Sequence, residues 1–417
     1  MKNQIVIIGQ DYSAMLCMAN SLKDYDVIIY KRVNKENKTK KNLKKLLLGN
    51  DIESLPNNVK EMIYFDTKLG SEEFANLLID KFKDNNYSKV LIIPTSDFTA
   101  SLIDECKEKY DEKFIFPNIN KKNNEIIELM DKSKQKDIAK KCGLNVIPQY
   151  NIEQKNGKYI IPKKIEFPIF IKPQISYMGN KTIMKKCNNI DELEETLKMI
   201  EKNFNCPLLI EKYVQIEKEY ATLGCSYNGE IIIPGVIEKI ATAKGKVNGV
   251  TLKGQTRKAD SYEDLIIKIK NFISELNFDG LFDIELYEEN GILYFNELNL
   301  RFGAEGYGIT GSGVNLPEIY AKKVFNIKID KIPLLKEKIF LSDKANLDSY
   351  ENYNINWKEY KNNSKDIDFS FIKSQNKKIR FHFFRMELYS HLKRIFKWGV
   401  KWKKEKLLSQ EKIMHLY

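Results

Sequence analysis

Residues 283–301 read DIELYEENGILYFNELNLR, and this stretch decides how the chain is interpreted. Asn290-Gly291 is typical of a two-residue β-hairpin turn, so the flanking segments are predicted to be paired antiparallel strands. Successive side chains of a strand point to opposite faces. Alternation therefore puts polar side chains on one face of each strand, with Asp283 and Glu285 on the first and Glu297, Asn299 and Arg301 on the second.

Two acidic side chains are predicted to face each other across this hairpin. Glu285 lies six residues before Gly291, and Glu297 lies six residues after it. Carboxylates about 4 Å apart repel by about 4 kcal/mol at an effective dielectric constant near 20, so a cation is expected between them. Carboxylate oxygens, with the amide oxygen of Asn299, suit Mg²⁺, which usually keeps waters and bridges to substrate phosphates.

The alternative for these acids is an exposed hairpin with one charged face. This alternative fits less well, because the opposite face of the hairpin is apolar. That face carries Ile284, Leu286, Phe295, Leu298 and Leu300. The hairpin is therefore expected to be packed against a core on one side and to hold a metal on the other.

Polar side chains upstream of the hairpin are candidates for contacts with a polyphosphate. The strand FPIFIKP carries Lys172 at its end, and Lys132 begins a helical segment, so both can present an ammonium group to phosphate oxygens. The loop QISYMGNK adds Ser176 and Lys181. Each lysine alone is more often a solvated surface group, so the order of the residues along the chain carries the interpretation.

The segment LLIEKYVQ is predicted to bind the base of a nucleotide. Backbone groups from Glu211 through Tyr213 to Val214 can read the edge of adenine, and Glu219 can accept hydrogen bonds from ribose hydroxyls. Here too the single residues are weak signals. Their position between the lysines and the hairpin is the stronger one.

Taken in order, DK at residues 131–132, FPIFIKP, IEKYV and FNELNLRFG resemble the ATP-grasp superfamily over about residues 131–313. The resemblance implies a two-lobed fold that holds ATP between α+β subdomains, preceded by an α/β preATP-grasp domain. It implies that Lys132 and Lys172 contact ATP phosphates and that Arg301 helps with the phosphate or acyl phosphate. The Mg²⁺ ligands that it implies are Glu285, Glu297 and Asn299.

Two short phrases point to a subgroup of the superfamily. PTSDF at residues 94–98 and SYMGNK at residues 176–181 look most like amino-acid ligases that resemble D-aspartate ligase. Many members have a glycine-rich lid over the phosphates, whereas QISYMGNK contains only Gly179. The contacts of the lid are therefore left open.

The reaction implied by this resemblance joins a carboxylate to an amine. A substrate carboxylate attacks the γ-phosphate of ATP, and an amine then displaces phosphate from the acyl phosphate. Positioning and charge neutralisation by Mg²⁺, Lys172 and Arg301 suffice, so no enzyme nucleophile is needed. This suits a chain whose three histidines all lie in its last 36 residues, at His382, His391 and His415. The expected partners are an amino acid or other small carboxylate and an amine acceptor.

The predicted fold class is α/β plus α+β. A parallel-sheet preATP-grasp domain is expected at residues 1–115 and an ATP-grasp domain at 116–330, with a lid subdomain at about 130–210. Alternating apolar strands and helices support the first unit. A C-terminal extension with a basic helical tail is expected at residues 331–417.

Two other functions are kept open. A non-catalytic nucleotide-binding module would need the acids of the hairpin to be structural. An NAD-dependent oxidoreductase would rest on IVIIGQ and on GYGITG at residues 306–311, which is literally GxGxxG. The first turn has one glycine where that fingerprint needs three, and GYGITG adjoins the hairpin. We interpret the glycine-rich stretch as a loop lining the acceptor site, with an irregular connection as an equal alternative.

Net charge is concentrated at the C-terminal end. The chain carries +12, of which residues 373–406 supply +10 from twelve Lys or Arg and two Glu. Aromatic side chains alternate with these cations, so the tail can contact an anionic membrane surface or an envelope glycan, or pack as a helix with a solvated basic face. Those aromatic residues are Phe381, Phe383, Phe384, Phe396, Trp398 and Trp402. Nucleic-acid binding is not expected.

Six scattered cysteines and the lack of a long apolar segment favour a cytoplasmic location, with peripheral membrane contact as an option. The N-terminal MKNQIVIIG has too short an apolar stretch to be read as a secretory signal. The oligomeric state is left open.

Overall fold

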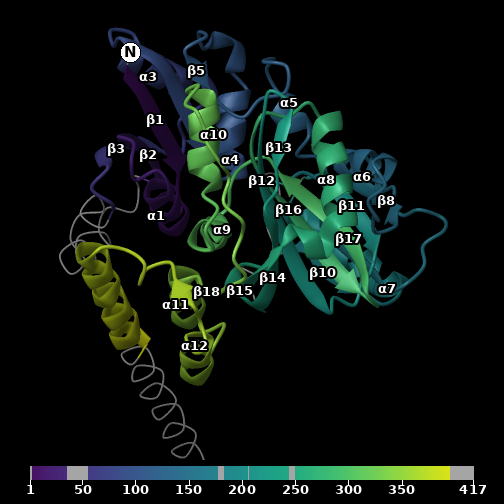
Figure 1. Cartoon of the computed structure of the whole chain (residues 1–417). Coiled ribbons are helices and arrows are strands. Elements are labelled where there is room, and N and C mark those ends of the chain that lie inside the picture. Colours follow the sequence, from purple (N-terminus) through teal and green to yellow (C-terminus); the bar gives the residue numbers. More distant parts are fainter. Residues whose placement is uncertain (1, 35–54, 177–182, 205, 244–248, 395–417) are drawn as a thin grey trace, which may run out of the picture.

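The chain is represented by a computed structural model that describes residues 2–34, 55–176, 183–204, 206–243 and 249–394 (Figure 1). The described strands form a five-stranded, a four-stranded and an eight-stranded sheet, together with a separate two-stranded hairpin. Among the described helices, none has the length and apolarity needed to cross a bilayer.

The first sheet is entirely parallel and has the order β3-β2-β1-β4-β5. Its strands are β1 (Lys2–Gly9), β2 (Val27–Val33), β3 (Val59–Asp66), β4 (Tyr87–Pro94) and β5 (Phe114–Ile115). The central strands read as continuous apolar runs because helices cover both faces. Helix α1 (Tyr12–Ser21) packs on one face, and α3 (Ser71–Phe82) and α4 (Asp97–Asp104) pack on the other. The predicted parallel α/β unit is confirmed.

The second sheet is antiparallel and has the order β10-β9-β11-β6. Its strands are β6 (Gln149–Tyr150), β9 (Ile169–Pro173), β10 (Lys185–Cys187) and β11 (Leu208–Lys212). Helix α7 (Ile190–Asn203) begins after Asn189, whose side chain accepts from the backbone N–H of Glu192. It buries one face, with Leu193, Leu197 and Ile200. The hairpin of β7 (Glu153–Lys155) and β8 (Lys158–Ile160) pairs separately.

The third sheet has the order β17-β16-β12-β14-β15-β18-β19, and β13 pairs with β12. Its strands are β12 (Lys218–Tyr227), β13 (Glu230–Ile232), β14 (Gly235–Thr242), β15 (Thr251–Lys258), β16 (Gly280–Glu289), β17 (Ile292–Asn299), β18 (Ile339–Leu341) and β19 (Phe369–Ser370). Helices α6 (Lys132–Lys141) and α8 (Glu263–Glu275) share a hydrophobic cluster with the apolar face of β16 and β17. This packing leaves the polar face of that hairpin for the site.

Short helices connect these sheets. They are η2 (Lys107–Lys109), α5 (Glu125–Glu128), η5 (Ala259–Tyr262), η6 (Ala304–Gly306), α9 (Tyr307–Gly311), α10 (Leu316–Val324), α11 (Asp343–Glu351) and α12 (Trp357–Asn363). Figure 1 shows α9 and α10 between the first and the third sheet. A last helix occupies residues 377–394, is coloured yellow in Figure 1, and contacts α11 and α12 through the Ser390–Glu351 and Tyr360–Glu387 hydrogen bonds.

Candidate active site

The structure contains the predicted hairpin, and its two acids face each other across the strands. Asn290 and Gly291 have positive φ angles of 52° and 74°, which match a tight turn between β16 and β17. The register then pairs Glu285 with Glu297 and Asp283 with Asn299. Three carboxylates and an amide therefore share one face of the sheet.

The pairing contains a bulge that the sequence did not reveal. Glu285 pairs with Glu297, but the next pair is Leu286 with Phe295, so Asn296 is an extra residue. The bulge turns Phe295 into the core, where it is fully buried. It also directs the Asn296 side chain into the site, where Oδ1 accepts from Lys172 Nζ at 2.9 Å. Strict alternation places Phe295 on the same face as Glu297, so the predicted position of Phe295 on the apolar face requires this bulge.

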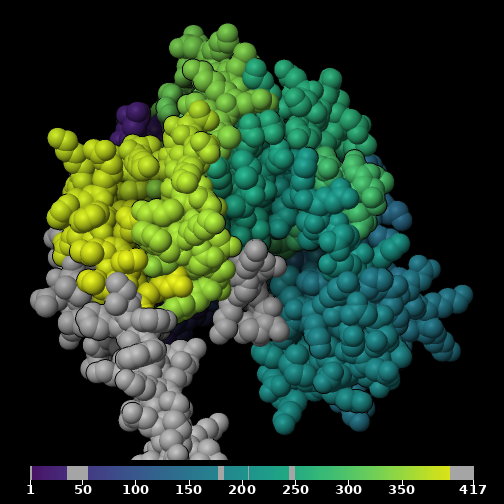
Figure 2. All heavy atoms as spheres, turned by 90° about the horizontal axis from the view of Figure 1, so that it is seen from below, coloured from purple at the N-terminus to yellow at the C-terminus, as the bar shows by residue number. Residues whose placement is uncertain are grey.

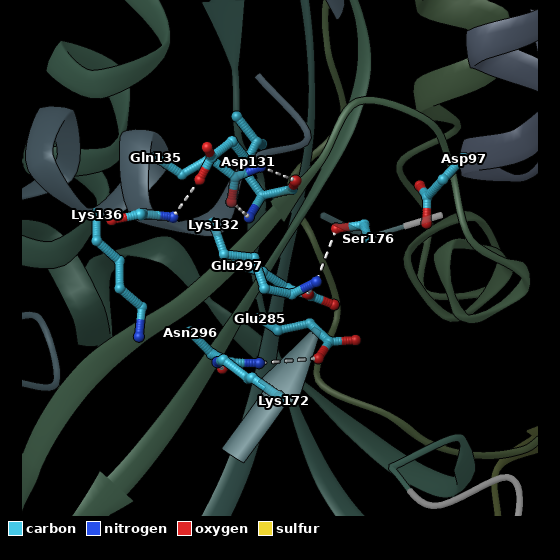
Figure 3. Close-up of polar contacts among 12 residues, drawn as sticks. Asp97, Asp131, Lys132, Gln135, Lys136, Lys172, Ser176, Glu285, Asn296 and Glu297 are labelled. Carbon is cyan, nitrogen blue, oxygen red and sulfur yellow. Dashed lines mark hydrogen bonds and ion pairs between the residues drawn. The ribbon is translucent and has the colours of Figure 1, made fainter. Parts of the chain in front are cut away.

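Lys132 reaches the hairpin from the first turn of α6. The side chain of Asp131 caps this helix by accepting from the backbone N–H groups of Ser133 and Lys134. Lys132 Nζ lies 3.0 Å from Glu297 Oε2 and donates to Ser176 Oγ at 2.9 Å (Figure 3). The predicted residues Lys132, Ser176 and Glu297 are thus brought together. Lys181 lies outside the described residues.

Lys172 lies one residue before the end of β9 and is buried between polar groups of the second and third sheets. Its Nζ lies 2.9 Å from Glu211 Oε2, and the other oxygen of Glu211 contacts Lys136. Burial lowers the pKa of Lys172 to about 7, and the positive charge of Lys132 acts in the same direction. Glu211 therefore presents its carboxylate to lysines, in addition to any role of its backbone near a base.

The two facing carboxylates differ in their electrostatic environment. Burial would raise the pKa of Glu297, but the ammonium groups of Lys132 and Lys172 outweigh this effect and lower that pKa to about 2. Burial raises the pKa of Glu285, although Lys239 at 3.7 Å opposes the shift. The charge of Glu285 is thus incompletely compensated by protein groups.

Arg301 connects the hairpin to the first sheet. Its Nε lies 3.2 Å from Asp97 Oδ1, at the start of α4, and its Nη1 lies 3.3 Å from Asp283 Oδ2. Asp283 is almost fully buried, and this burial raises its pKa well above the usual value. Figure 3 shows Asp97 reaching toward the site from a separate segment. Asp97 lies within PTSDF, a phrase that served only to indicate a subgroup, so it was not predicted as a site residue.

The predicted base-binding segment lies at the end of β11. The backbone N–H groups of Lys212 and Tyr213 donate to the carbonyls of Pro148 and Pro168, so these two donors are already used. The Tyr213 ring lies under Lys186 Nζ at 4.1 Å from its centroid, and Val214 is buried. These contacts fix the course of the chain after β11.

Glu219 lies in β12 of the third sheet, whereas the base-binding segment follows β11 of the second sheet. It pairs with Lys239 of β14 and Tyr287 of β16. Its nearest neighbours in the sheet therefore include the buried ammonium of Lys239. Lys239 was not among the predicted site residues, and its Nζ also donates to the Gly249 carbonyl at 3.2 Å.

The glycine-rich stretch does not form the expected loop. Residues 304–311 are helical, as η6 and α9, and their glycines pack against aromatic rings. A Cβ atom on Gly308 would lie 2.5 Å from Phe340, and one on Gly306 would lie 2.1 Å from Phe302. The predicted loop conformation is therefore wrong for these residues. GYGITG does not follow a strand as a phosphate-binding turn, so it gives no support to NAD binding.

The donor set fits a hard cation that completes its shell with other ligands. Within the described ranges, no group of three or more His, Cys, Asp or Glu side chains could hold a metal alone. The buried Nδ2 of Asn299 has no hydrogen-bond partner among the described residues, so no hydrogen bond of that atom opposes the flipped orientation of this amide. Two carboxylates and one amide suit Mg²⁺ that takes further oxygens from phosphate and water.

Comparisons with known proteins agree with this architecture. Residues 137–311 match the ATP-grasp domain model. The chain is 28% identical over 225 residues to the D-alanine--D-alanine ligase of Staphylococcus carnosus, an alignment that covers 50% of this chain. It spans 61% of the length of that ligase.

Solved structures share the fold at low identity. An L-amino acid ligase from Bacillus licheniformis superposes with a TM-score of 0.58 at 15% identity, covering 81% of this chain and 79% of the ligase. N5-carboxyaminoimidazole synthetase from Staphylococcus aureus gives 0.59 at 18% identity, with 85% and 86% covered. The chain therefore has an N-terminal parallel sheet followed by an ATP-grasp fold.

Proposed function

We propose that this chain, which contains an ATP-grasp domain, is an ATP- and Mg²⁺-dependent carboxylate–amine ligase. The observation that carries the proposal is the register that sets Glu285 opposite Glu297 and Asp283 opposite Asn299, beside two buried lysines from other segments. A cluster with both acids and cations in this order suits a metal-bound polyphosphate.

In the proposed complex, ATP lies between the second and third sheets. Lys132 and Lys172 bind phosphate oxygens, and Ser176 and Lys181 are proposed to add contacts to them. The base rests against residues 211–214, including Tyr213 and Val214, and the ribose lies toward Glu219. Glu285, Glu297 and Asn299 would hold Mg²⁺. When bound, this cation neutralises phosphate charge and orients the γ-phosphate.

The proposed reaction has two displacement steps. An oxygen of the substrate carboxylate attacks the γ-phosphorus, and the bond to the bridging oxygen breaks, which releases ADP and leaves an acyl phosphate. An amine then attacks the acyl carbon, loses a proton and displaces phosphate, so an amide forms. Lys172 and Arg301 stabilise the charge that develops on the transferred group, since both are held at fixed positions by carboxylates.

The substrate class is proposed to be an amino acid that is joined to an amine acceptor of the cell envelope. The D-alanine--D-alanine ligase and the L-amino acid ligase named above act, by their names, on amino acids. The phrases PTSDF and SYMGNK, with their resemblance to D-aspartate ligase-type proteins, support the same class. The identity of the amino acid and its stereochemistry are to be found by assay.

A substitution in the hairpin tests the proposal. Phosphate release from MgATP is measured with a panel of D- and L-amino acids, with and without amine acceptors, for the unmodified chain and for Glu297→Gln. The amide keeps the shape of the side chain but removes its charge, so turnover is expected to fall about 100-fold or more. Glu195→Gln, an exposed acid of α7, is the matched control and should behave as the unmodified chain.

Two results would contradict the ligase. One is the absence of amino-acid-dependent phosphate release across the panel. The other is Glu297→Gln turning over as fast as the unmodified chain, which would favour a non-catalytic nucleotide-binding module.

We also propose that the helix at residues 377–394 docks on an anionic membrane surface, which suits an envelope acceptor and a peripheral location at the inner face of the membrane. One face of the helix packs on the body through Ile379, Phe383 and Ser390. The opposite face exposes an apolar stripe at helical spacing, formed by Phe381, Phe384, Leu388 and Leu392. Figure 2 shows this C-terminal part as an outer face of the molecule.

Charge favours a lipid surface as the occupant of this stripe. Lys377, Lys378 and Arg385 flank it on the helix, and residues 373–406 carry a net +10. Cations beside an apolar stripe are typical of helices that lie in the interface of an anionic bilayer.

Vesicle sedimentation tests this surface. The full chain should pellet with phosphatidylglycerol vesicles and much less with phosphatidylcholine vesicles, and Phe381→Ser/Phe384→Ser/Leu388→Ser should abolish pelleting. Ile267→Ser, at an exposed apolar position of α8, is the control. Equal pelleting of the triple variant would contradict the proposal. A dimer seen by sedimentation velocity for the unmodified chain and for Ile267→Ser, but not for the triple variant, would also contradict it. The stripe would then bind a second copy of the chain.

A further inference from the structure

We infer that Lys136, which the sequence did not single out, is a positioning residue that holds Glu211 and thereby sets the ammonium of Lys172 for phosphate binding. This inference rests on the proposed function, since it concerns the same nucleotide site. It assigns a role to a side chain outside the predicted set of phosphate ligands.

Burial makes Lys136 unusual for a lysine on a polar helix. It lies one turn after Lys132 on α6, so both side chains project from the same side of the helix. The Lys136 side chain is 1% exposed, and its ammonium contacts the carboxylate of Glu211, which is 3% exposed. Lysine is almost never fully buried unless it is paired, so the pairing needs an explanation.

Glu211 is shared between two ammonium groups from different elements. One oxygen contacts Lys136 of α6, and the other lies 2.9 Å from Lys172 of β9. Lys172 also donates to Asn296 at the bulge of β17. The ammonium of Lys172 is therefore fixed by the second lobe through Glu211 and by the hairpin through Asn296.

The helix that carries Lys136 is itself fixed to the metal-site hairpin. Gln135 is fully buried, and its Nε2 donates to the carbonyl of Leu298 at 2.8 Å. In return, the backbone N–H of Leu298 donates to Gln135 Oε1 at 2.8 Å. Gln135 thus connects α6 to the hairpin, and Lys136 connects it to β11; both are labelled with Lys132 in Figure 3.

Charge sharing explains why two lysines surround one carboxylate. With both present, Glu211 neutralises each ammonium only in part, and a net positive charge is left for phosphate oxygens. If Lys136 is lost, Glu211 interacts with Lys172 alone. That ion pair then competes with the nucleotide for the ammonium of Lys172, so binding of ATP weakens.

A purely structural role for Lys136 predicts something different. Replacing a buried ion-pair partner changes the free energy of unfolding through the uncompensated charge left behind. Such a change would lower the melting temperature without selectively changing the KM for ATP. Any non-additivity with Glu211→Gln would then appear in the melting temperature and not in the KM for ATP.

A double-mutant cycle separates these roles. Lys136→Met, Lys136→Arg, Glu211→Gln and Lys136→Met/Glu211→Gln are compared in the amino-acid-dependent phosphate release assay and by melting temperature with and without MgATP. Lys140→Met, an exposed lysine one turn further along α6, is the control. A coupling between the two sites shows as non-additivity.

Lys136→Met is expected to raise the KM for ATP about tenfold and to reduce the MgATP-induced rise in melting temperature, with kcat changed much less. Lys136→Arg should restore most of the affinity, because it keeps the charge. In the Glu211→Gln background, Lys136→Met should have little further effect, because the competing carboxylate charge is gone.

Two outcomes would overturn the inference. One is an unchanged KM for ATP in folded Lys136→Met. The other is an effect of equal size with and without Glu211→Gln. Neither outcome would affect the ligase proposal as long as the unmodified chain is active, whereas an inactive unmodified chain would contradict that proposal first.

Discussion

At the scale of single residues, the site is a set of buried charges that only partly cancel. Lys132 pairs with Glu297, and Lys172 and Lys136 share Glu211. Lys132 and Lys172 were predictable because Lys132 begins a recognisable helix and Lys172 lies at the end of a recognisable strand. Lys136 was not, since it lies in KSKQKDIAKK, where nothing distinguishes a buried lysine from its exposed neighbours.

The environment of Lys172 predicts a pH dependence. Its pKa is lowered from 10.5 to about 7, so in the free protein its ammonium loses its proton as the pH rises through about 7. Affinity for MgATP is expected to fall above that pH, by up to about tenfold per unit. In Lys172→Arg the guanidinium stays charged, so this dependence should be flattened. Isothermal titration calorimetry from about pH 6 to 9 measures both.

The same shift affects stability with a defined sign. Between about pH 7 and 10 the unfolded chain keeps a proton on Lys172 that the folded chain has lost. The contribution of Lys172 to the free energy of unfolding should therefore rise with pH over that window. For the binding experiment, an equal pH dependence of MgATP affinity in the unmodified chain and in Lys172→Arg would show that another group titrates.

At the scale of elements, the hairpin of β16 and β17 was predictable and its bulge was not. The turn residues Asn290-Gly291 and the alternation fixed the register near the turn. The bulge at Asn296 depends on packing, because Phe295 fits the core behind the sheet better than the polar face. The helical conformation of residues 304–311 was missed for a similar reason, since glycines are poor helix formers and only the neighbouring rings account for them.

Helix α9 offers a test of that packing. Gly308→Ala would place a Cβ atom 2.5 Å from a ring carbon of Phe340. This overpacking is expected to cost about 1–3 kcal/mol and to lower the melting temperature, with the KM for the acceptor little changed. Phe340→Leu in the same chain should relieve part of the cost. If Gly308→Ala instead raised the KM for the acceptor without changing the melting temperature, residues 304–311 would contribute to substrate binding and not to packing alone.

At the scale of the whole molecule, distant segments meet at one place. Arg301 of the hairpin region bonds to Asp97 at the edge of the first sheet, so the N-terminal unit reaches the candidate site. One hydrophobic cluster also contains Leu16, Ile237, Phe340 and Ile379, which come from all three proposed domains. The order of motifs predicted the lobes, but contacts between units depend on side-chain geometry that no local pattern encodes.

The measurement that tests the central claim most directly follows an oxygen atom. The amino acid that supports phosphate release is supplied with ¹⁸O in its carboxylate, and the phosphate released during amide formation is analysed by mass spectrometry. Phosphorylation of the carboxylate predicts that each phosphate carries one labelled oxygen. Unlabelled phosphate, released at the same rate as amide, would contradict an acyl-phosphate ligase.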